Sequence, residues 1–209
     1  MRLRAAFVAF LALLVSGCVV GSGDLTSSQR PVEGFDRIRL STSGIALIEI
    51  TGTDSLTIEA EENILPILTS DVVDGVLVLG SDGSFTSSRG ITYTITASSL
   101  QGVEVTGSGD LEADGIDSSS FVALISGSGS VRPSGQCTTL AIEVSGSGSF
   151  QGDDLRCAIG RVAVAGSGDA RVDVTDTLDA TVTGSGTIEY LGDPELSSSI
   201  SGSGDIQQG

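Results

Sequence analysis

The chain has 209 residues, which is enough for one domain with a substantial core. It contains 29 Gly, no Trp and no His, and its many Val, Ile, Thr and Ser residues favour strands over helices. The formal net charge of −17 excludes a general nucleic-acid binder, because such a protein needs a basic face, and it opposes electrostatic docking onto an anionic membrane.

Residues 1–17 have the features of a lipoprotein signal peptide rather than of a folded segment. Two arginines precede the apolar run AAFVAFLALLV (5–15), which is too short to span a bilayer. The run ends in VSGC, where an aliphatic residue and two small residues precede Cys18, and this pattern resembles the bacterial lipobox. The resemblance implies cleavage before Cys18, a diacylglycerol on its sulfur and usually a third acyl chain on its amine. An ordinary signal peptide with an incidental cysteine is the alternative.

The mature chain is therefore expected to begin with a lipidated, short polar tether at 18–30. Two or more acyl chains anchor a protein stably, since each buried CH₂ contributes about 0.8 kcal/mol. Val19 rather than Asp follows the cysteine, and by the same resemblance this favours export to the outer membrane of a Gram-negative cell. We expect an exported protein anchored in the cell envelope, facing either the periplasm or the cell surface.

Residues 31–106 alternate apolar and polar side chains with the period of 2 that is typical of strands with one buried face. Expected strands are FDRIRL (35–40), IALIEI (45–50), SLTIEA (55–60), VLVLG (76–80) and ITYTITA (91–97). Asp74-Gly75 predicts a hairpin turn, and EENILPILTS (61–70) predicts one short helical turn or a loop. We expect wide, irregular coils or a strand layer that caps the segment that follows.

The remainder of the chain is a repeat built on the triplet Gly-Ser-Gly. The first glycines of the triplets are Gly107, Gly127, Gly146, Gly166, Gly184 and Gly202. Val or Ile stands two positions before every triplet, and mostly apolar residues stand four positions before and four after. One strand face per unit of about 20 residues indicates an all-β fold, a parallel β-helix or solenoid with about six short coils. Each triplet is then a corner, because stacked corners leave little room for a Cβ.

The residue after each triplet also follows a pattern. In order, these residues are Asp110, Ser130, Ser149, Asp169, Thr187 and Asp205. No two Asp are neighbours in the expected stack, so each carboxylate should face a hydroxyl group rather than a like charge. Calcium-binding repeats place Gly-Asp units every nine residues, which is half of this period, so no metal site is assigned.

Two cysteines stand in equivalent positions of adjacent units. Cys137 and Cys157 each lie nine residues before a triplet, so they share one register on neighbouring coils. Neighbouring ladder positions have a Cα separation that a disulfide accepts, and export makes oxidation favourable. We therefore predict a Cys137–Cys157 disulfide, whereas two cysteines without any histidine make a metal site improbable.

Four sequence blocks resemble, in their order, the family called the putative auto-transporter adhesin head GIN domain. The blocks are GFDRIRLSTSG (34–44), ITGTDSLTIEAEENILPIL (50–68), DGVLVLG (74–80) and SLQGVEVTGSGDL (99–111), followed by the Gly-Ser-Gly coils. The likeness covers 31–209, which is taken as one domain. It implies a right-handed parallel β-helix, frequently on an envelope lipoprotein, and a role in adhesion. It brings no catalytic motif.

The favoured function is a non-enzymatic, lipid-anchored adhesin or structural module of the envelope. Its expected partners are the membrane, through the acyl chains, and an unidentified protein or glycan. Self-association through a terminal coil stays possible, whereas no nucleic acid, cofactor or metal is expected.

The alternatives are a lyase or hydrolase acting on a polysaccharide, or a carbohydrate-binding protein. Asp153-Asp154 offers paired carboxylates, but such neighbours are more typical of a solvated turn, and the eight cationic residues after Cys18 are scattered. Carbohydrate binding usually needs exposed aromatic rings, for which Tyr93, Tyr190 and a few Phe are available. No catalytic residue is assigned.

Overall fold

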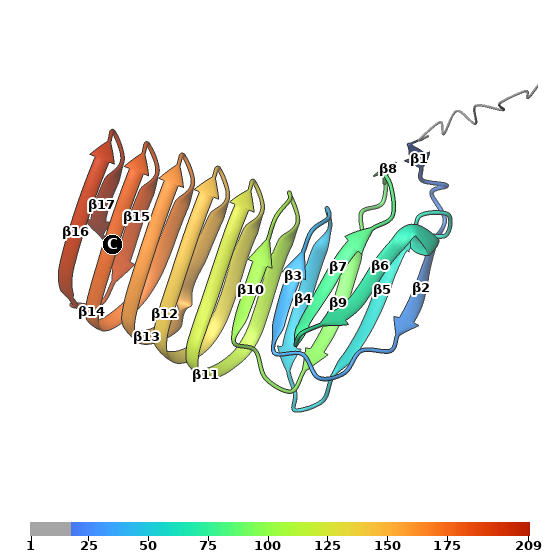
Figure 1. The fold of residues 1–209 in the computed structure, drawn as a ribbon, viewed down its shortest axis with the longest axis horizontal. Helices are drawn as coiled ribbons and strands as arrows, with labels where there is room; N and C mark the ends of the chain where they lie inside the picture. Colours follow the sequence, from blue (N-terminus) through green and yellow to red (C-terminus); the bar gives the residue numbers. More distant parts are fainter. Residues whose placement is uncertain (1–17) are drawn as a thin grey trace, which may run out of the picture.

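The computed structural model describes residues 18–209, so the expected signal peptide at 1–17 lies outside the described residues. About 70% of the described chain is strand, and the strands form a β-solenoid of about 5 turns, close to the six coils expected. Figure 1 shows the coils stacked side by side along the long axis, with two flat faces that meet at corners. Buried aliphatic side chains fill the space between the two faces as one continuous core.

Long, bent strands build the regular part of the solenoid. They are β10 (Gly102–Val105), β11 (Asp110–Gly127), β12 (Ser130–Gly146), β13 (Ser149–Gly166), β14 (Asp169–Gly184), β15 (Thr187–Leu191), β16 (Glu195–Gly202) and β17 (Asp205–Gln208). The rear face consists of the first halves of β11–β14 together with β15 and β17. The front face consists of β10, the second halves of β11–β14 and β16. All of these pairings are parallel, and Val144, Val164 and Val182 stand in one ladder, as the repeat predicted.

The first two coils are formed out of chain order. One comprises β3 (Arg37–Leu40) and β4 (Ile45–Ile50), and the other comprises β7 (Val76–Ser81) and β9 (Thr92–Ala97). The earlier coil lies between the later one and the regular solenoid, because β3 pairs with both β7 and β10 while β4 pairs with both β9 and β11. This arrangement leaves the β7–β9 coil at the end of the stack.

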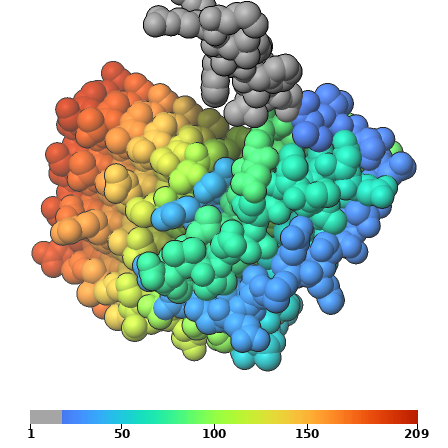
Figure 2. Space-filling view, turned by 45° about the vertical axis from the view of Figure 1, so that its right-hand side comes forward, coloured from blue at the N-terminus to red at the C-terminus, as the bar shows by residue number. Residues whose placement is uncertain are grey.

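Antiparallel strands cap that end of the stack. On the front face, β6 (Leu68–Val73) pairs with β7 through a tight hairpin in which Asp74 and Gly75 have φ of 52° and 76°, as predicted. On the rear face, β5 (Ser55–Glu61) pairs with β9. The predicted helical turn is the 3-10 helix η1 (Leu65–Ile67). These cap segments are the blue and teal surface that closes the near end in Figure 2.

The segment 18–30 is not a free tether, which corrects the expectation from its polar composition. The strand β2 (Leu25–Arg30) pairs along its whole length with β5, and β1 (Val19–Val20) pairs with β8 (Phe85–Thr86). Polar side chains are compatible with β2 because it is an edge strand with little buried surface. The folded domain therefore begins next to Cys18 rather than at residue 31.

The Gly-Ser-Gly triplets form the corners between the front and rear faces, as predicted. A Cβ placed on Gly166 would lie 2.5 Å from the carbonyl oxygen of Gly146, which is the equivalent glycine of the preceding coil. The φ angle of Gly166 is 119°, a conformation that other residues rarely adopt. The segment Ser41–Gly44 is one further corner, since the backbone N–H of Asp110 on the next coil donates to the Gly44 carbonyl. In this corner, Thr42 stands where the triplets have their first glycine.

Candidate functional surfaces

Cys18, the expected lipidation residue, is exposed at the beginning of a segment that the fold holds in place. We call residues 18–24 the arm. Its strand β1 lies parallel to β8, and Asn63 adds two contacts: its side-chain N–H donates to the Val20 carbonyl at 2.7 Å, and its side-chain oxygen accepts from the Ser22 N–H at 2.9 Å. Within residues 18–209, no helix is long and apolar enough to cross a membrane.

Glu61 connects the arm to the loop 82–91. Its carboxylate is buried and accepts hydrogen bonds from the Ser87 hydroxyl at 2.7 Å, the Ser88 hydroxyl at 2.8 Å and the Gly23 N–H at 2.8 Å. The Ser87 bond, together with those from Ser88 and Gly23, lowers the pKa of Glu61 to about 2, although desolvation opposes ionisation. Glu61 is therefore an anion at neutral pH that fastens the arm to the cap.

Nothing in the local sequence pattern identifies Glu61. Leu56, Ile58 and Ala60 point inward along β5, so alternation would place the next residue outside. Its burial arises from two segments distant in sequence, the arm and the loop 82–91, which close over it. Sequence reasoning consequently missed this residue.

The solenoid has two rows of corners with different chemistry. The Gly-Ser-Gly ridge consists of the six triplets, each with an exposed central serine, and carries no charged residue within the triplets. The opposite row, which we call the acidic ridge, joins the rear face of each coil to the front face. Its carboxylates are Asp114, Asp117, Asp153, Asp154, Asp173, Asp176, Asp193 and Glu195, with Arg156 as a cation among them. This row of corners thus carries more carboxylates than the triplets and the residues that directly follow them, among which only Asp110, Asp169 and Asp205 are acidic.

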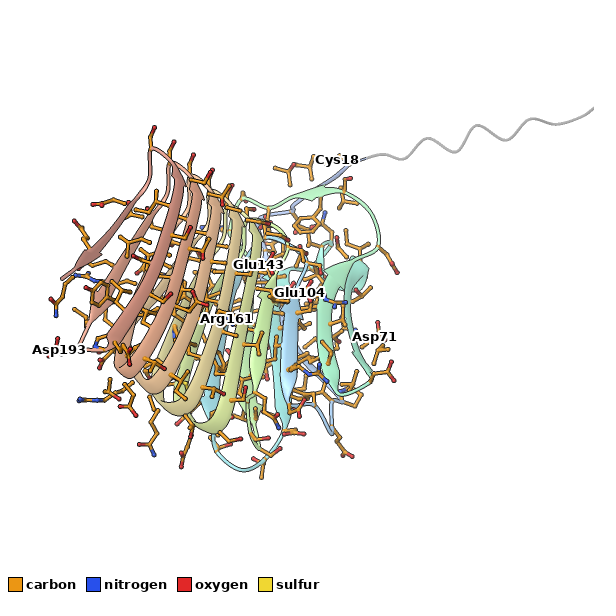
Figure 3. The ribbon with its side chains drawn as sticks, turned by 60° about the vertical axis from the view of Figure 1, so that its left-hand side comes forward. Cys18, Asp71, Glu104, Glu143, Arg161 and Asp193 are labelled. Atoms are coloured by element: carbon orange, nitrogen blue, oxygen red, sulfur yellow. A yellow bond between two sulfur atoms is a disulfide. The ribbon has the colours of Figure 1, made fainter. Side chains whose placement is uncertain are left out.

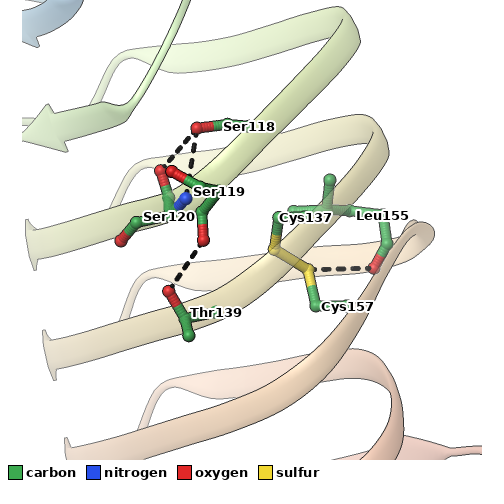
Figure 4. Close-up of a disulfide and its surroundings, with 7 residues drawn as sticks. All are labelled: Ser118, Ser119, Ser120, Cys137, Thr139, Leu155 and Cys157. Carbon is green, nitrogen blue, oxygen red and sulfur yellow. Dashed lines mark hydrogen bonds between the residues drawn. A yellow bond between two sulfur atoms is a disulfide. The ribbon is translucent and has the colours of Figure 1, made fainter.

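The predicted disulfide joins two coils at the acidic ridge (Figure 4). Cys137 on β12 and Cys157 on β13 are direct partners in the parallel ladder, with a Cα–Cα distance of 4.6 Å. Cys157 is buried, whereas Cys137 is partly exposed. The bond therefore fastens adjacent coils at the corner opposite the triplets, which confirms the pairing derived from the repeat.

Charged side chains on the rear face are arranged as ladder pairs. Arg132 lies 3.7 Å from Glu112, and Arg171 lies 2.6 Å from Glu189 and 3.3 Å from Asp153. These arginines stand on different coils and each faces carboxylates from neighbouring coils, so they do not form one cationic site. The scattered distribution expected from the sequence is confirmed for these residues.

The residues after the triplets interact partly as predicted: a hydroxyl group donates to Asp110, whereas Asp169 accepts from a backbone N–H. The Ser130 hydroxyl and backbone N–H both donate to the Asp110 carboxylate, and the Thr187 N–H donates to Asp169 at 3.1 Å. Asp110 and Asp169 therefore find donors on the next coil, whereas Asp205 accepts from the N–H of Ile206 on its own coil. In the part of the chain from 18 to 209, no group of three or more His, Cys, Asp or Glu is arranged to hold a metal ion.

The residues considered for the alternative functions are dispersed. The Tyr93 ring is fully buried in the β7–β9 coil, so the expectation that it is available for carbohydrate stacking is wrong. Its inward position on β9 and its place between the two faces explain the burial. Tyr190 is partly exposed, and Asp153 is paired with Arg171. Asp153 and Asp154 lie within β13, at a register shift, rather than in a separate turn.

An open hollow of about 620 Å³ lies on the front face near the carboxyl-terminal coils. Leu140, Ile159 and Leu178 contribute apolar surface, and Arg161 faces Asp179 at 3.5 Å. Figure 3 shows Arg161, Glu104 and Glu143 spread along this face rather than converging on one point. Two carboxylates, Asp179 and Glu195, line the hollow, and Asp179 is paired with Arg161, so this side of the solenoid can contact a partner through an ion pair beside aliphatic side chains.

Comparisons with known proteins agree with this architecture. A putative adhesin from Bacteroides fragilis is 25% identical, with 91% of this chain and 99% of that chain covered and a TM-score of 0.74. A putative lipid binding protein from Parabacteroides distasonis is 21% identical, with coverage of 92% and 100% and a TM-score of 0.56. A putative adhesin from Parabacteroides merdae is 18% identical, with coverage of 91% and 98% and a TM-score of 0.56. No curated protein matches the chain.

The family comparison covers most of the domain. The family model described as "Putative auto-transporter adhesin, head GIN domain" matches residues 34–194, which include β3 to β15 in full and therefore both the irregular coils and most of the regular ones. The expected family and the solenoid fold are thereby confirmed. This chain belongs to the auto-transporter adhesin head GIN domain family.

Proposed function

We propose that the protein is a non-enzymatic adhesion module, held at the bacterial envelope by acyl chains on Cys18 and acting through the surface of its solenoid. Membership of an adhesin head-domain family is the observation that carries this proposal. The lipobox-like sequence before Cys18 supports the anchor, as does the exposure of Cys18 at the start of the folded domain. Attachment to the outer membrane is part of the same proposal.

The construction of the solenoid suits a contact surface. Its two faces are continuous parallel ladders fastened by the Cys137–Cys157 bond, so outward side chains keep fixed spacings from coil to coil. Their charges are distributed along the faces instead of being gathered at one site, as Arg132 and Arg171 illustrate. Outward side chains on successive coils can therefore contact a protein or glycan partner at several points along one face.

A cell-attachment assay tests the proposal. Cells that lack the protein should lose attachment to their surface or to neighbouring cells, and the wild-type gene should restore it. The Cys18→Ser variant should fold and be exported but should not restore attachment, because it cannot be acylated. Glu143→Ala, which removes one exposed carboxylate on the front face, should weaken attachment only slightly.

The alternative function, an enzyme that acts on a polysaccharide, predicts different results. Turnover of a polysaccharide by the purified domain would overturn the non-enzymatic proposal, especially if a single carboxylate substitution abolished turnover while the melting temperature stayed unchanged. Full restoration of attachment by Cys18→Ser would contradict the anchor. The two readouts therefore test the chemistry and the anchoring separately.

A further inference from the structure

The structure assigns a fixed orientation to the anchored protein: the Gly-Ser-Gly ridge lies toward the lipid headgroups, and the acidic ridge is displayed away from the membrane. This inference rests on the proposed acylation of Cys18. It adds to that proposal the surface that meets the membrane and the surface left free for a partner. Three observations carry it: the short, fastened arm, the side of the solenoid on which the arm lies, and the distribution of charge.

The arm allows little separation between the acyl chains and the folded domain. If 18–30 were a free tether, it could extend about 45 Å at about 3.5 Å per residue. Instead, β1 begins at the residue after Cys18, and hydrogen bonds from Asn63 and to Glu61 hold the following residues. Acyl chains on Cys18 would therefore bring the adjacent protein surface to the headgroups.

The arm lies in the row of Gly-Ser-Gly corners. The loop 82–91 connects β7 to β9 just as each triplet connects a front strand to a rear strand. It stacks on the corner of the next coil, because the Ile45 N–H donates to the Ile91 carbonyl at 2.9 Å and a Cβ on Gly44 would meet the same carbonyl. Since β1 pairs with β8 inside this loop, Cys18 shares the side of the ridge, whereas Asp193 lies on the other side (Figure 3).

Charge favours the same orientation. The triplets carry no charge, and three carboxylates follow them directly, Asp110, Asp169 and Asp205, compared with eight on the acidic ridge; the approach of the triplets to an anionic headgroup layer therefore meets less repulsion. The acidic ridge carries the eight carboxylates named above, and its approach would be opposed. The distance between the ridges exceeds the screening length: Ser119 and Ser128 are nine residues apart on one coil, or up to about 30 Å, compared with a Debye length of about 8 Å.

The acidic ridge is then the surface that a partner meets first. Carboxylates project along it from β11, β13, β14 and the coil that ends in β16, between Asp114 and Glu195, whereas β12 contributes none. A partner with a complementary row of cationic groups fits this side best, because opposite charges steer encounter and fix register. Attachment that depends on this ridge should accordingly weaken as salt is raised.

Depth-dependent fluorescence quenching tests the orientation. The lipidated full protein, carrying either Ser128→Cys or Ser119→Cys, is labelled with a fluorophore and reconstituted into vesicles of phosphatidylethanolamine and phosphatidylglycerol with a nitroxide on some headgroups. Both positions are exposed and lie on the same coil, so they are equally far along the solenoid from Cys18. We expect several-fold stronger quenching at position 128 than at position 119. Equal quenching, or stronger quenching at position 119, would overturn the orientation.

Two controls separate this inference from the anchoring on which it rests. Flotation of the Cys18→Ser variant with the vesicles would refute the acyl anchor, whereas flotation of the acylated protein with equal quenching would refute only the orientation. A flexible Gly-Ser insertion between Cys18 and Val19 should keep the protein on the vesicles and reduce the difference between positions 128 and 119. An unchanged difference after the insertion would show that the arm does not set the orientation.

Discussion

The close backbone approach at the Gly-Ser-Gly corners predicts a specific cost for adding one methyl group there. In Gly166→Ala, the new Cβ would lie 2.5 Å from the Gly146 carbonyl oxygen. An ordinary contact begins near 3.4 Å, so the two coils would have to separate locally by about 0.9 Å out of a spacing of about 4.8 Å. The Ser167 N–H donates to that same carbonyl at 2.9 Å, so the shift would also break a hydrogen bond between the coils.

The expected destabilisation of Gly166→Ala is about 3 kcal/mol. Forcing a residue with a Cβ to a φ of 119° costs about 2 kcal/mol, and loss of the Ser167 hydrogen bond adds about 1 kcal/mol. Gly52→Ala is the matched control, because Gly52 has a φ of 85° but a Cβ added there would meet no heavy atom within 4 Å. The free energy of unfolding of that control should fall only by the cost of holding a residue with a Cβ at positive φ, about 1 to 2 kcal/mol.

Thermal unfolding of the two variants, followed by far-UV circular dichroism, measures this difference. For a domain of this size, 1 kcal/mol shifts Tm by about 2–4 °C, so Gly166→Ala should lower Tm by about 6–12 °C. Gly52→Ala should lower it by about one third to two thirds of that. Equal shifts would refute the reasoning, because they would mean that close stacking of the triplets adds nothing to the conformational requirement for glycine.

Three further predictions follow from burial, cross-linking and charge. Val164→Asp should unfold or loosen the solenoid, because it buries a carboxylate among aliphatic side chains. The adjacent outward change Ala165→Asp, whose ladder neighbours are Ser145 and Thr183, should alter stability by no more than about 0.5 kcal/mol, and equal Tm values would contradict the assigned faces. Replacing both Cys137 and Cys157 by Ser should lower the free energy of unfolding by about 3 kcal/mol, since the disulfide closes a loop with a sequence separation of 20. Urea unfolding measures this loss, and an unchanged midpoint would contradict the prediction. Because the folded-state pKa of Glu61 is depressed from 4.5 to about 2, the stability that its charge contributes is fully present above about pH 4.5 and is lost as pH falls toward 2. The Tm difference between wild type and Glu61→Gln should shrink over that range, and a difference independent of pH would refute this role.

The regular coils could be predicted because each of them repeats the same local pattern. An inward aliphatic residue stands two positions before every triplet, and the triplet spacing fixes which residues meet on adjacent coils. That register was sufficient to pair Cys137 with Cys157. The Asp74-Gly75 turn was also predictable, because its conformational requirement lies within two residues.

The amino-terminal arrangement could not be predicted, because it depends on pairings between distant segments. The β3–β4 coil lies between the β7–β9 coil and the regular solenoid because of which strand edges pair, and both coils have a similar alternation of apolar and polar residues. The strand β2 carries mostly polar side chains and is fixed by its partner β5 rather than by its own pattern. The corner at Ser41–Gly44 was missed for a simpler reason: Thr42 replaces the first glycine of the triplet, so the motif is incomplete.

The central claim is that Cys18 carries the lipid that holds this adhesin-type solenoid at the envelope, and mass spectrometry of the mature amino terminus tests it most directly. The protein should be extracted from bacterial membranes with detergent, and its amino-terminal peptide should be sequenced. We predict that the chain begins at Cys18, with diacylglycerol on the sulfur and an acyl chain on the amine. A mature chain that begins at another residue, or one with an unmodified Cys18, would contradict the account.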